Sequence, residues 1–159
     1  MRIGLGYDVH AFSTAPERRL MLGGVEFPGE PGLAGHSDAD VVTHAVCDAL
    51  LGAAALGDIG DHFPPGDPRW RDADSLTLLE QVLEMLAERY AIGNVDVTVI
   101  AELPMIGARR DEMRAALATA LGIDVGQVSV KATTNERLGA LGRSEGIAAL
   151  AVALVEERG

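Results

Sequence analysis

Strand-like and helix-like segments alternate along most of this chain of 159 residues, and their order limits the folds open to it. Apolar residues on both sides of Gly23-Gly24 indicate a hairpin over residues 20–27. Four β-branched or alternating runs indicate strands, over residues 1–9, 95–101, 128–134 and 147–155. This order predicts an α/β (α+β-like) fold, a single domain over residues 1–159 with a βαβαβ-like core and extra β-structure at the front.

The segments between these runs have helical sequence. Residues 40–57 are rich in Ala and Leu, begin at a possible cap and end before Gly57. Leucines and Val82 recur at spacings of three and four over residues 75–90, where Ser75 can cap and Gly93-Asn94 can stop a helix. A further helix is predicted over residues 111–121. Residues 57–74 are crowded with Gly, Pro and Asp; since long loops in compact domains are usually functional or disordered, we expect this loop to cover a substrate.

The charge and cysteine content exclude several classes of protein. A formal net charge of -11 argues against a partner that is nucleic acid or an anionic membrane, because such binding depends on basic patches. A phosphate ligand would therefore need metal ions and backbone N–H groups to offset repulsion. Cys47 is the single cysteine, residues 1–10 lack the layout of a secretory signal, and no apolar run reaches the ~20 residues of a membrane span. We expect a cytoplasmic protein that is not membrane-bound.

One group of residues has the spacing of a metal site. Asp8 and His10 lie two apart on a strand and so project from the same side, while Asp40, His44 and Asp48 form one stripe on a helix. Catalytic zinc takes about three ligands from His and carboxylate and keeps one position open, which Asp8, His10 and His44 can supply. Spacing alone leaves hydrogen-bonded polar residues as the alternative. Cys47 is expected in the core, and His62 outside the metal site.

Two further segments suit a phosphate. Before the helix that begins near Asp40, either Ser37 or Asp38 can cap, which leaves N–H groups of the first turn for an anion. A plain helix cap is the alternative there. Residues 131–136 (KATTNE) place hydroxyls and a carboxylate at the end of a strand, where Glu136 can bind a phosphate through Mg²⁺. The alternative for Glu136 is a solvated acid in a turn.

Six motifs stand out along the chain, namely GYDVHAF, GHSDADVVTHAVCDALLGAAALGDIGDHFPP, DADS, GNVDVTVIAELP, VKATTNERLG and GRSEGIA. In their order and spacing they resemble the 2-C-methyl-D-erythritol 2,4-cyclodiphosphate synthase family over nearly the whole chain. The resemblance implies a lyase of the non-mevalonate isoprenoid pathway, in which a CDP-methylerythritol 2-phosphate closes on itself and expels CMP. It implies a four-stranded sheet with helices on one face, assembled as a homotrimer with active sites between subunits. A zinc-dependent phosphohydrolase and a non-catalytic nucleotide-binding or structural-zinc protein remain the alternatives.

By the same resemblance, zinc or another divalent transition metal is bound by Asp8, His10 and His44, and Mg²⁺ or Mn²⁺ by Glu136. His36 and Thr134 are implied as catalytic. Arg143 and Glu145 match a segment near the trimer axis, where a central cavity can take an isoprenoid diphosphate. The sequence departs from the family at Met105, where Lys is frequent, at Ala140, where an aromatic is frequent, and at Pro65. The implied substrate contacts are Asp8, His10, His36, Ser37, Asp48, Asp58, Ile59, Gly60, Phe63, Asp67, Ala101, Pro104, Met105, Ile106, Ala132, Thr133, Thr134, Asn135, Glu136 and Arg143.

Overall fold

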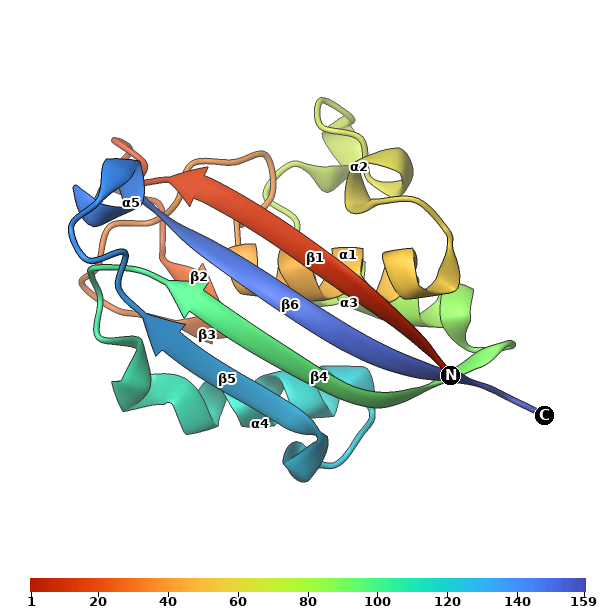
Figure 1. The fold of residues 1–159 in the computed structure, drawn as a ribbon. Helices are drawn as coiled ribbons and strands as arrows, with labels where there is room; N and C mark the ends of the chain where they lie inside the picture. The colour runs from red at the N-terminus through yellow and green to blue at the C-terminus, as the bar shows by residue number, and fades with distance from the viewer.

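The computed structural model describes residues 1–159 and contains a four-stranded sheet with helices packed on one face (Figure 1). The strand order is β1-β6-β4-β5. The first two pairs in this order are antiparallel and β4 runs parallel to β5, so the sheet is mixed. The strands are β1 (Arg2–Ala11), β4 (Tyr90–Ile100), β5 (Val128–Thr133) and β6 (Gly146–Glu157). The predicted mixed α/β class and four-stranded sheet are confirmed.

Three longer helices lie behind the sheet in Figure 1, namely α1 (Val41–Ala54), α3 (Ser75–Leu86) and α4 (Arg110–Leu121). Helix α1 is the central one and is buried along almost its whole length. It lies directly on β1 because that strand carries Gly4 and Gly6 on the facing side. A Cβ at either glycine would lie 1.9 Å from a backbone oxygen of α1, so no larger residue fits without moving the helix.

The predicted hairpin is present as the pair β2 (Met21–Leu22) and β3 (Val25–Glu26). Residues 57–74 are not structureless, since they contain the short helix α2 (Ile59–His62) and the 3₁₀ turn η1 (Pro68–Trp70). The remaining short elements are η2 (Ile106–Arg109), η3 (Val125–Gln127) and α5 (Gly139–Gly142).

The predicted boundary between the second helix and the following strand was wrong. Helix α3 ends at Leu86, and β4 begins at Tyr90 rather than near Val95. Residues Tyr90–Ile92 pair with the end of β6, and the register shifts at Gly93. Gly93 therefore marks a bulge inside a strand rather than the end of a helix.

One predicted helix cap was wrong, because helix α3 is capped by Asp74 and Ser75 is its first residue. Of the candidates for helix α1, the acid at the start of residues 40–57 is confirmed, since Asp40 caps the helix and Ser37 and Asp38 do not. The Asp40 carboxylate accepts from two N–H groups of the first turn of α1, and also from those of Gly23 and Gly24 at 2.8 and 2.7 Å. Asp40 thus ties the hairpin to the helix.

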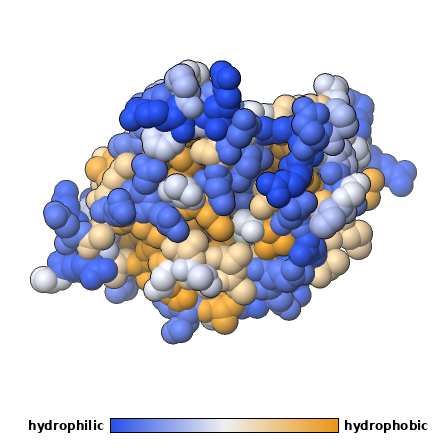
Figure 2. Space-filling model, turned by 180° about the vertical axis from the view of Figure 1, so that it is seen from behind, coloured by the Kyte–Doolittle hydropathy of each residue, from blue (hydrophilic) through white to orange (hydrophobic).

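The two faces of the molecule differ in polarity. The face of the sheet turned toward the viewer in Figure 1 carries no helix, and β1 exposes Ile3, Leu5, Tyr7 and Val9 on it. The opposite face is largely hydrophilic in its upper part, with an apolar area below (Figure 2). No helix combines the length and the apolar character required to cross a membrane.

Candidate functional site

Asp8, His10 and His44 meet at the edge of the sheet formed by β1. The potential ligand atoms of these three residues all lie within 4.8 Å of one another. Asp8 Oδ2 is 3.1 Å from Nε2 of His10 and 3.0 Å from Nδ1 of His44. Asp8 and His10 share a side of β1, and His44 reaches them from the second turn of α1. The spacing of these residues in the sequence had indicated this cluster.

The far nitrogen of each imidazole has its own partner. Nδ1 of His10 lies 2.7 Å from the carbonyl oxygen of Ala34. Nε2 of His44 lies 2.9 Å from the Ser75 hydroxyl and 3.1 Å from the Ser37 hydroxyl. Hydrogen bonds of this kind fix which nitrogen carries a proton and how the ring is oriented. The nitrogens nearest Asp8 are therefore the ones presented as ligands.

The three groups polarise one another. Burial opposes the charge on Asp8, but hydrogen bonds from His10 and His44 hold the pKa of its carboxyl well below the usual range. Burial likewise opposes protonation of His44, yet the hydrogen bond and charge of Asp8 raise the pKa of the imidazole above its ordinary value. An ionised carboxylate next to imidazoles held in place suits a dication, which replaces the shared protons.

The donor set fits a transition metal. Two imidazoles and one carboxylate are the ligands of many catalytic zinc sites, and they leave a coordination position for water or a substrate. The other two acids of the predicted helical stripe have different partners. Asp40 caps α1, and Asp48 accepts a hydrogen bond at 2.8 Å from the N–H of Ile59 in α2. Burial raises the pKa of Asp48.

A pocket of about 240 Å³ opens beside the metal cluster. Residues 57–74 form one wall, where the rings of Phe63 and Trp70 pack edge to face at 5.0 Å. The pocket contains both polar groups from the helix start and apolar groups from the loop. Its lining residues are Asp8, His10, His36, Ser37, His44, Ile59, Gly60, Phe63, Pro65, Trp70 and Leu78.

Four other residues of this region do not line the pocket. The side chain of Asp58 caps α2, and that of Asp67 pairs with Arg69 at 2.7 Å. The backbone oxygen of Asp67 instead contacts Nε2 of His36 at 2.9 Å, which ties the loop to the segment before α1. His62 stays outside the cluster, with Nε2 at 2.8 Å from the Leu56 carbonyl oxygen, and Cys47 is fully buried in the core.

A second pocket, of about 400 Å³, lies at the ends of β4 and β5. At its rim Thr134 donates a hydrogen bond to the Glu136 carboxylate at 2.8 Å. Glu136 and Arg137 have φ angles of 50° and 60°, which residues other than glycine rarely adopt. Glu102 holds this turn by accepting from the N–H groups of Asn135 and Arg137. The lining residues are Ala101, Glu102, Pro104, Met105, Ile106, Gly107, Arg110, Ala132, Thr133, Thr134 and Glu136.

These two pockets lie at opposite edges of the sheet. Residues Asp8, Ala149, Val99 and Ala132 stand in one row across the four strands. Neighbouring strands are about 4.8 Å apart, so three spacings put Asp8 and Ala132 roughly 14 Å from each other. The metal cluster and the second pocket of one chain therefore do not form a single cavity.

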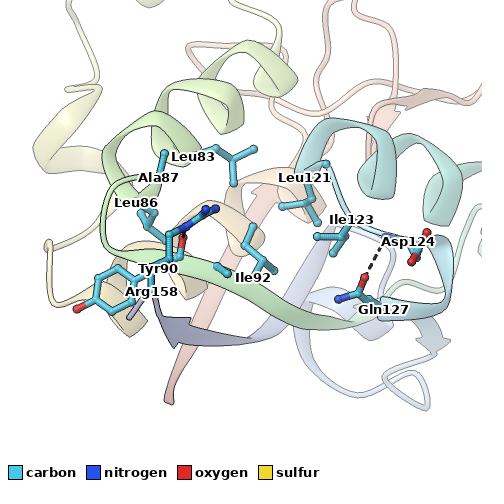
Figure 3. A pocket seen from close by; sticks show the side chains of 12 residues that line it. Leu83, Leu86, Ala87, Tyr90, Ile92, Leu121, Ile123, Asp124, Gln127 and Arg158 are labelled. Carbon is cyan, nitrogen blue, oxygen red and sulfur yellow. Dashed lines mark hydrogen bonds between the residues drawn. The ribbon is translucent and has the colours of Figure 1, made fainter.

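The structure also shows a pocket of about 650 Å³ far from both (Figure 3). It lies between the ends of α3 and α4 and is lined mainly by apolar side chains, including Leu83, Leu121 and Ile123. None of the predicted site residues lines it. Arg143 and Asn135, two predicted substrate contacts, line none of these three pockets. Arg143 pairs with Glu145 at 2.6 Å, and the Asn135 amide donates to the Leu138 carbonyl oxygen at 2.7 Å.

Several residues of these sites were not singled out from the sequence. Trp70 and Leu78 line the pocket beside the metal cluster, and Arg110 is the only basic side chain lining the second pocket. Ser75 contacts His44, although 31 positions separate them. Glu102 supports the turn at Glu136. The motif DADS contains Ser75, but no spacing rule links it to a histidine on another helix.

Comparison with known proteins gives a consistent result. The model of the YgbB family matches residues 1–156. A 2-C-methyl-D-erythritol 2,4-cyclodiphosphate synthase of Dehalococcoides mccartyi is 59% identical over 159 residues, which cover 99% of this chain and 100% of that protein. The synthase of the same name from Thermosynechococcus vestitus is 57% identical over 98% of this chain and 96% of its own. A solved structure, IspF of Plasmodium falciparum in complex with CDP, has a TM-score of 0.86 and 36% identity, covering 99% of this chain and 97% of that one.

Proposed function

The chain belongs to the YgbB family, and we propose that Asp8, His10 and His44 hold the divalent metal with which it acts as a 2-C-methyl-D-erythritol 2,4-cyclodiphosphate synthase. The enzyme converts 4-diphosphocytidyl-2-C-methyl-D-erythritol 2-phosphate into the cyclodiphosphate and CMP in the isoprenoid precursor pathway. The observation that carries the metal assignment is the convergence of two imidazole nitrogens on Asp8 Oδ2 beside a pocket.

The reaction closes a ring within one molecule. An oxygen of the 2-phosphate forms a bond to the β-phosphorus, the bond from the β-phosphorus to the oxygen bridging to the α-phosphate breaks, and CMP leaves with that oxygen and its electron pair. No water is consumed. The barrier comes from bringing two anions together, so positioning and charge neutralisation should dominate catalysis.

The first pocket suits the reacting phosphates and the sugar. A divalent ion bound there supplies positive charge that offsets the repulsion between the two phosphates. His36 and Ser37 line the same pocket beside the metal cluster, where their side chains can contact a phosphate. Ile59, Gly60 and Phe63 form the loop wall and would pack on the erythritol carbons, while Asp48 holds that loop through Ile59. Asp58 and Asp67 would act through the loop that they stabilise.

The second pocket suits the cytidine part of the substrate. Its residues Ala101–Ile106 and Ala132–Thr134 offer backbone groups and small side chains to a base, and the solved relative of similar fold binds CDP. Thr134 and Glu136 lie at its rim, where Thr134 would steady the transferring phosphate and Glu136 would hold Mg²⁺ or Mn²⁺, whose charge would offset that of the phosphates. Met105 is 77% exposed there and cannot supply a cation, which leaves Arg110 as the nearest basic side chain.

We further infer a homotrimer with active sites between subunits. In one chain the two pockets lie at opposite edges of the sheet, so a single substrate would need the metal pocket of one subunit and the second pocket of another. The open face of the sheet supports this assembly, because Ile3, Leu5 and Tyr7 are all more than half exposed in the single chain. Contact with another subunit would bury this apolar surface. An isoprenoid diphosphate near Arg143 and a cytoplasmic location remain predictions.

The decisive experiment incubates the purified protein with the CDP-methylerythritol 2-phosphate substrate, Zn²⁺ and Mg²⁺ in ¹⁸O-labelled water. We expect CMP and the cyclic diphosphate in equal amounts, with no label in either. Incorporation of ¹⁸O would instead support the zinc-dependent phosphohydrolase, which the comparisons do not favour. The variant His44→Ala should lose bound zinc and turnover together, and full activity of a zinc-free His44→Ala protein would refute the metal assignment.

A further inference from the structure

We propose that Ser75, held by Asp38, is a positioning residue for the metal-binding imidazole of His44. Its hydroxyl accepts the proton on Nε2 of that ring and so holds Nδ1 toward Asp8, where the metal would bind. The inference rests on the proposed metal role of His44 and deepens it. Ser75 contacts Nε2, while Nδ1 faces Asp8, and Ser75 does not line the pocket, so it would act only through that ring.

The contacts form a continuous chain from a carboxylate to the imidazole. Ser75 is the first residue of α3 and has no exposed surface. Its hydroxyl lies 2.9 Å from Nε2 of His44 and also contacts Oδ1 of Asp38. The backbone N–H of Ser75 donates to Oδ2 of the same carboxylate at 3.0 Å. Both carboxylate oxygens of Asp38 therefore accept hydrogen bonds from Ser75.

The direction of each hydrogen bond follows from what each group can do. An ionised carboxylate only accepts, so the Ser75 O–H must point at Asp38. The serine oxygen then presents a lone pair to His44, and Nε2 must carry a proton to bond with it. Nδ1 is then the atom left for the metal, which would take the place of the proton that Nδ1 shares with Asp8 in the metal-free protein. Nδ1 is also the atom that lies 3.0 Å from Oδ2 of Asp8.

The other hydroxyl near His44 cannot make this selection. Ser37 lies 3.1 Å from the same nitrogen and accepts from the N–H of Ala39, but none of its hydrogen bonds goes to a carboxylate. Its hydroxyl can therefore donate or accept at Nε2. His10 shows the same arrangement as the proposed one, since the Ala34 carbonyl oxygen at its Nδ1 can only accept. Each of the two metal-binding rings thus has, besides Asp8, an acceptor at the nitrogen farther from the cluster.

The test compares Ser75→Ala with the wild-type chain and with a matched control. Thr43→Val is the control, because the Thr43 hydroxyl is also fully buried and precedes His44, but it donates to Asp40 at 2.8 Å and does not contact the ring. ¹⁵N NMR of the zinc-loaded proteins reports how fast the Nε2 proton of His44 exchanges with water, because a proton held in a hydrogen bond exchanges slowly. Competition with a chelator gives the zinc affinity.

We expect slow exchange of the Nε2 proton in the wild type and in Thr43→Val, and faster exchange of that proton in Ser75→Ala. Zinc should bind Ser75→Ala about 10- to 100-fold more weakly, the usual effect of removing a group that orients a metal ligand. Asp38→Asn should weaken zinc in the same way while keeping the serine. Far-UV circular dichroism and urea unfolding check that each variant is folded.

Two results would overturn the inference. One is a folded Ser75→Ala protein in which the exchange of the Nε2 proton and the zinc affinity match the wild type, and the other is a folded Thr43→Val protein that loses as much zinc affinity as Ser75→Ala. Failure of the proposed function looks different. In that case zinc would not bind the wild type at Asp8, His10 and His44 at all.

Discussion

The variant Gly6→Ala should separate the metal ligands without touching any of them. A Cβ at position 6 would lie 1.9 Å from the backbone oxygen of Ala45 and 2.7 Å from the N of Ala49, both in α1. An ordinary contact begins near 3.4 Å, so the helix must move by about 1.5 Å at the residue that follows His44. The neighbouring atoms are backbone and cannot rotate away.

Two magnitudes follow from this displacement. Overpacking of a close-packed interface typically costs about 1–3 kcal/mol, which urea unfolding of the metal-free protein would measure. A misplacement of about 1 Å in a catalytic group can cost roughly 100-fold in rate, and we expect a comparable loss in turnover. Zinc affinity should fall because His44 moves with α1 while Asp8 and His10 stay with β1.

The matched control is Gly52→Ala in the same helix. A Cβ at Gly52 meets no atom within 4 Å, so the substitution adds no clash and should stabilise α1 by about 0.5–1 kcal/mol. The same chemical change therefore has opposite signs at two positions. A Gly6→Ala protein that unfolds like the wild type and binds zinc with wild-type affinity would refute the argument that helix contact aligns the site.

Three further predictions concern the charges and the open face of the sheet. In the metal-free protein, the raised pKa of His44 contributes stability that is present below its ordinary value of 6.5 and is lost as the pH rises through the folded pKa. The lowered pKa of Asp8 contributes stability that is present above its ordinary value of 3.8 and is lost as the pH falls through the folded pKa. Urea unfolding should therefore show the largest stabilisation from Asp8 and His44 between pH 3.8 and pH 6.5 and a smaller one at pH 9. His44→Gln should remove this difference. The variant Glu136→Gln should make CMP formation nearly independent of Mg²⁺ while zinc content stays unchanged, and an unaltered Mg²⁺ requirement would contradict the role of that carboxylate. Tyr7→Asp should give monomers in analytical ultracentrifugation and little turnover, whereas Met85→Asp, on the helix-covered face, should leave assembly and turnover unchanged.

The parts of the fold that were predictable from the sequence depend on contacts close in the chain. Helix α1 has a capping acid, an Ala- and Leu-rich interior and a glycine after its end, so its bounds were nearly right. The start of β4 was missed because Tyr90–Ile92 are held in a strand by pairing with the far end of β6. Leucines up to Leu86 continue a helical pattern, and nothing local signals that Gly93 is a bulge.

The same distinction applies to the site. Asp8 and His10 could be paired from the alternation of a strand, and His44 could be added because its helix carries a polar stripe. Not all residues of this polar stripe belong to the metal cluster. Asp40 faces the hairpin, where it accepts from Gly23 and Gly24, and Asp48 faces α2. Which neighbour a helical side chain meets depends on packing that the spacing does not contain.

The metal cluster is consequently a property of the packed core rather than of any one segment. Its ligands come from β1 and α1, the distance between these elements is set by Gly4 and Gly6, and the orientation of His44 depends on the first residue of α3. Each of these contacts joins residues more than thirty positions apart. Zinc affinity should therefore report on the packing of the whole domain, because any change that moves α1 or α3 alters the geometry of the ligands before it alters their chemistry. Variants at Gly6 and Ser75 probe distance and orientation separately, so their effects on zinc affinity should add if the two contacts are independent.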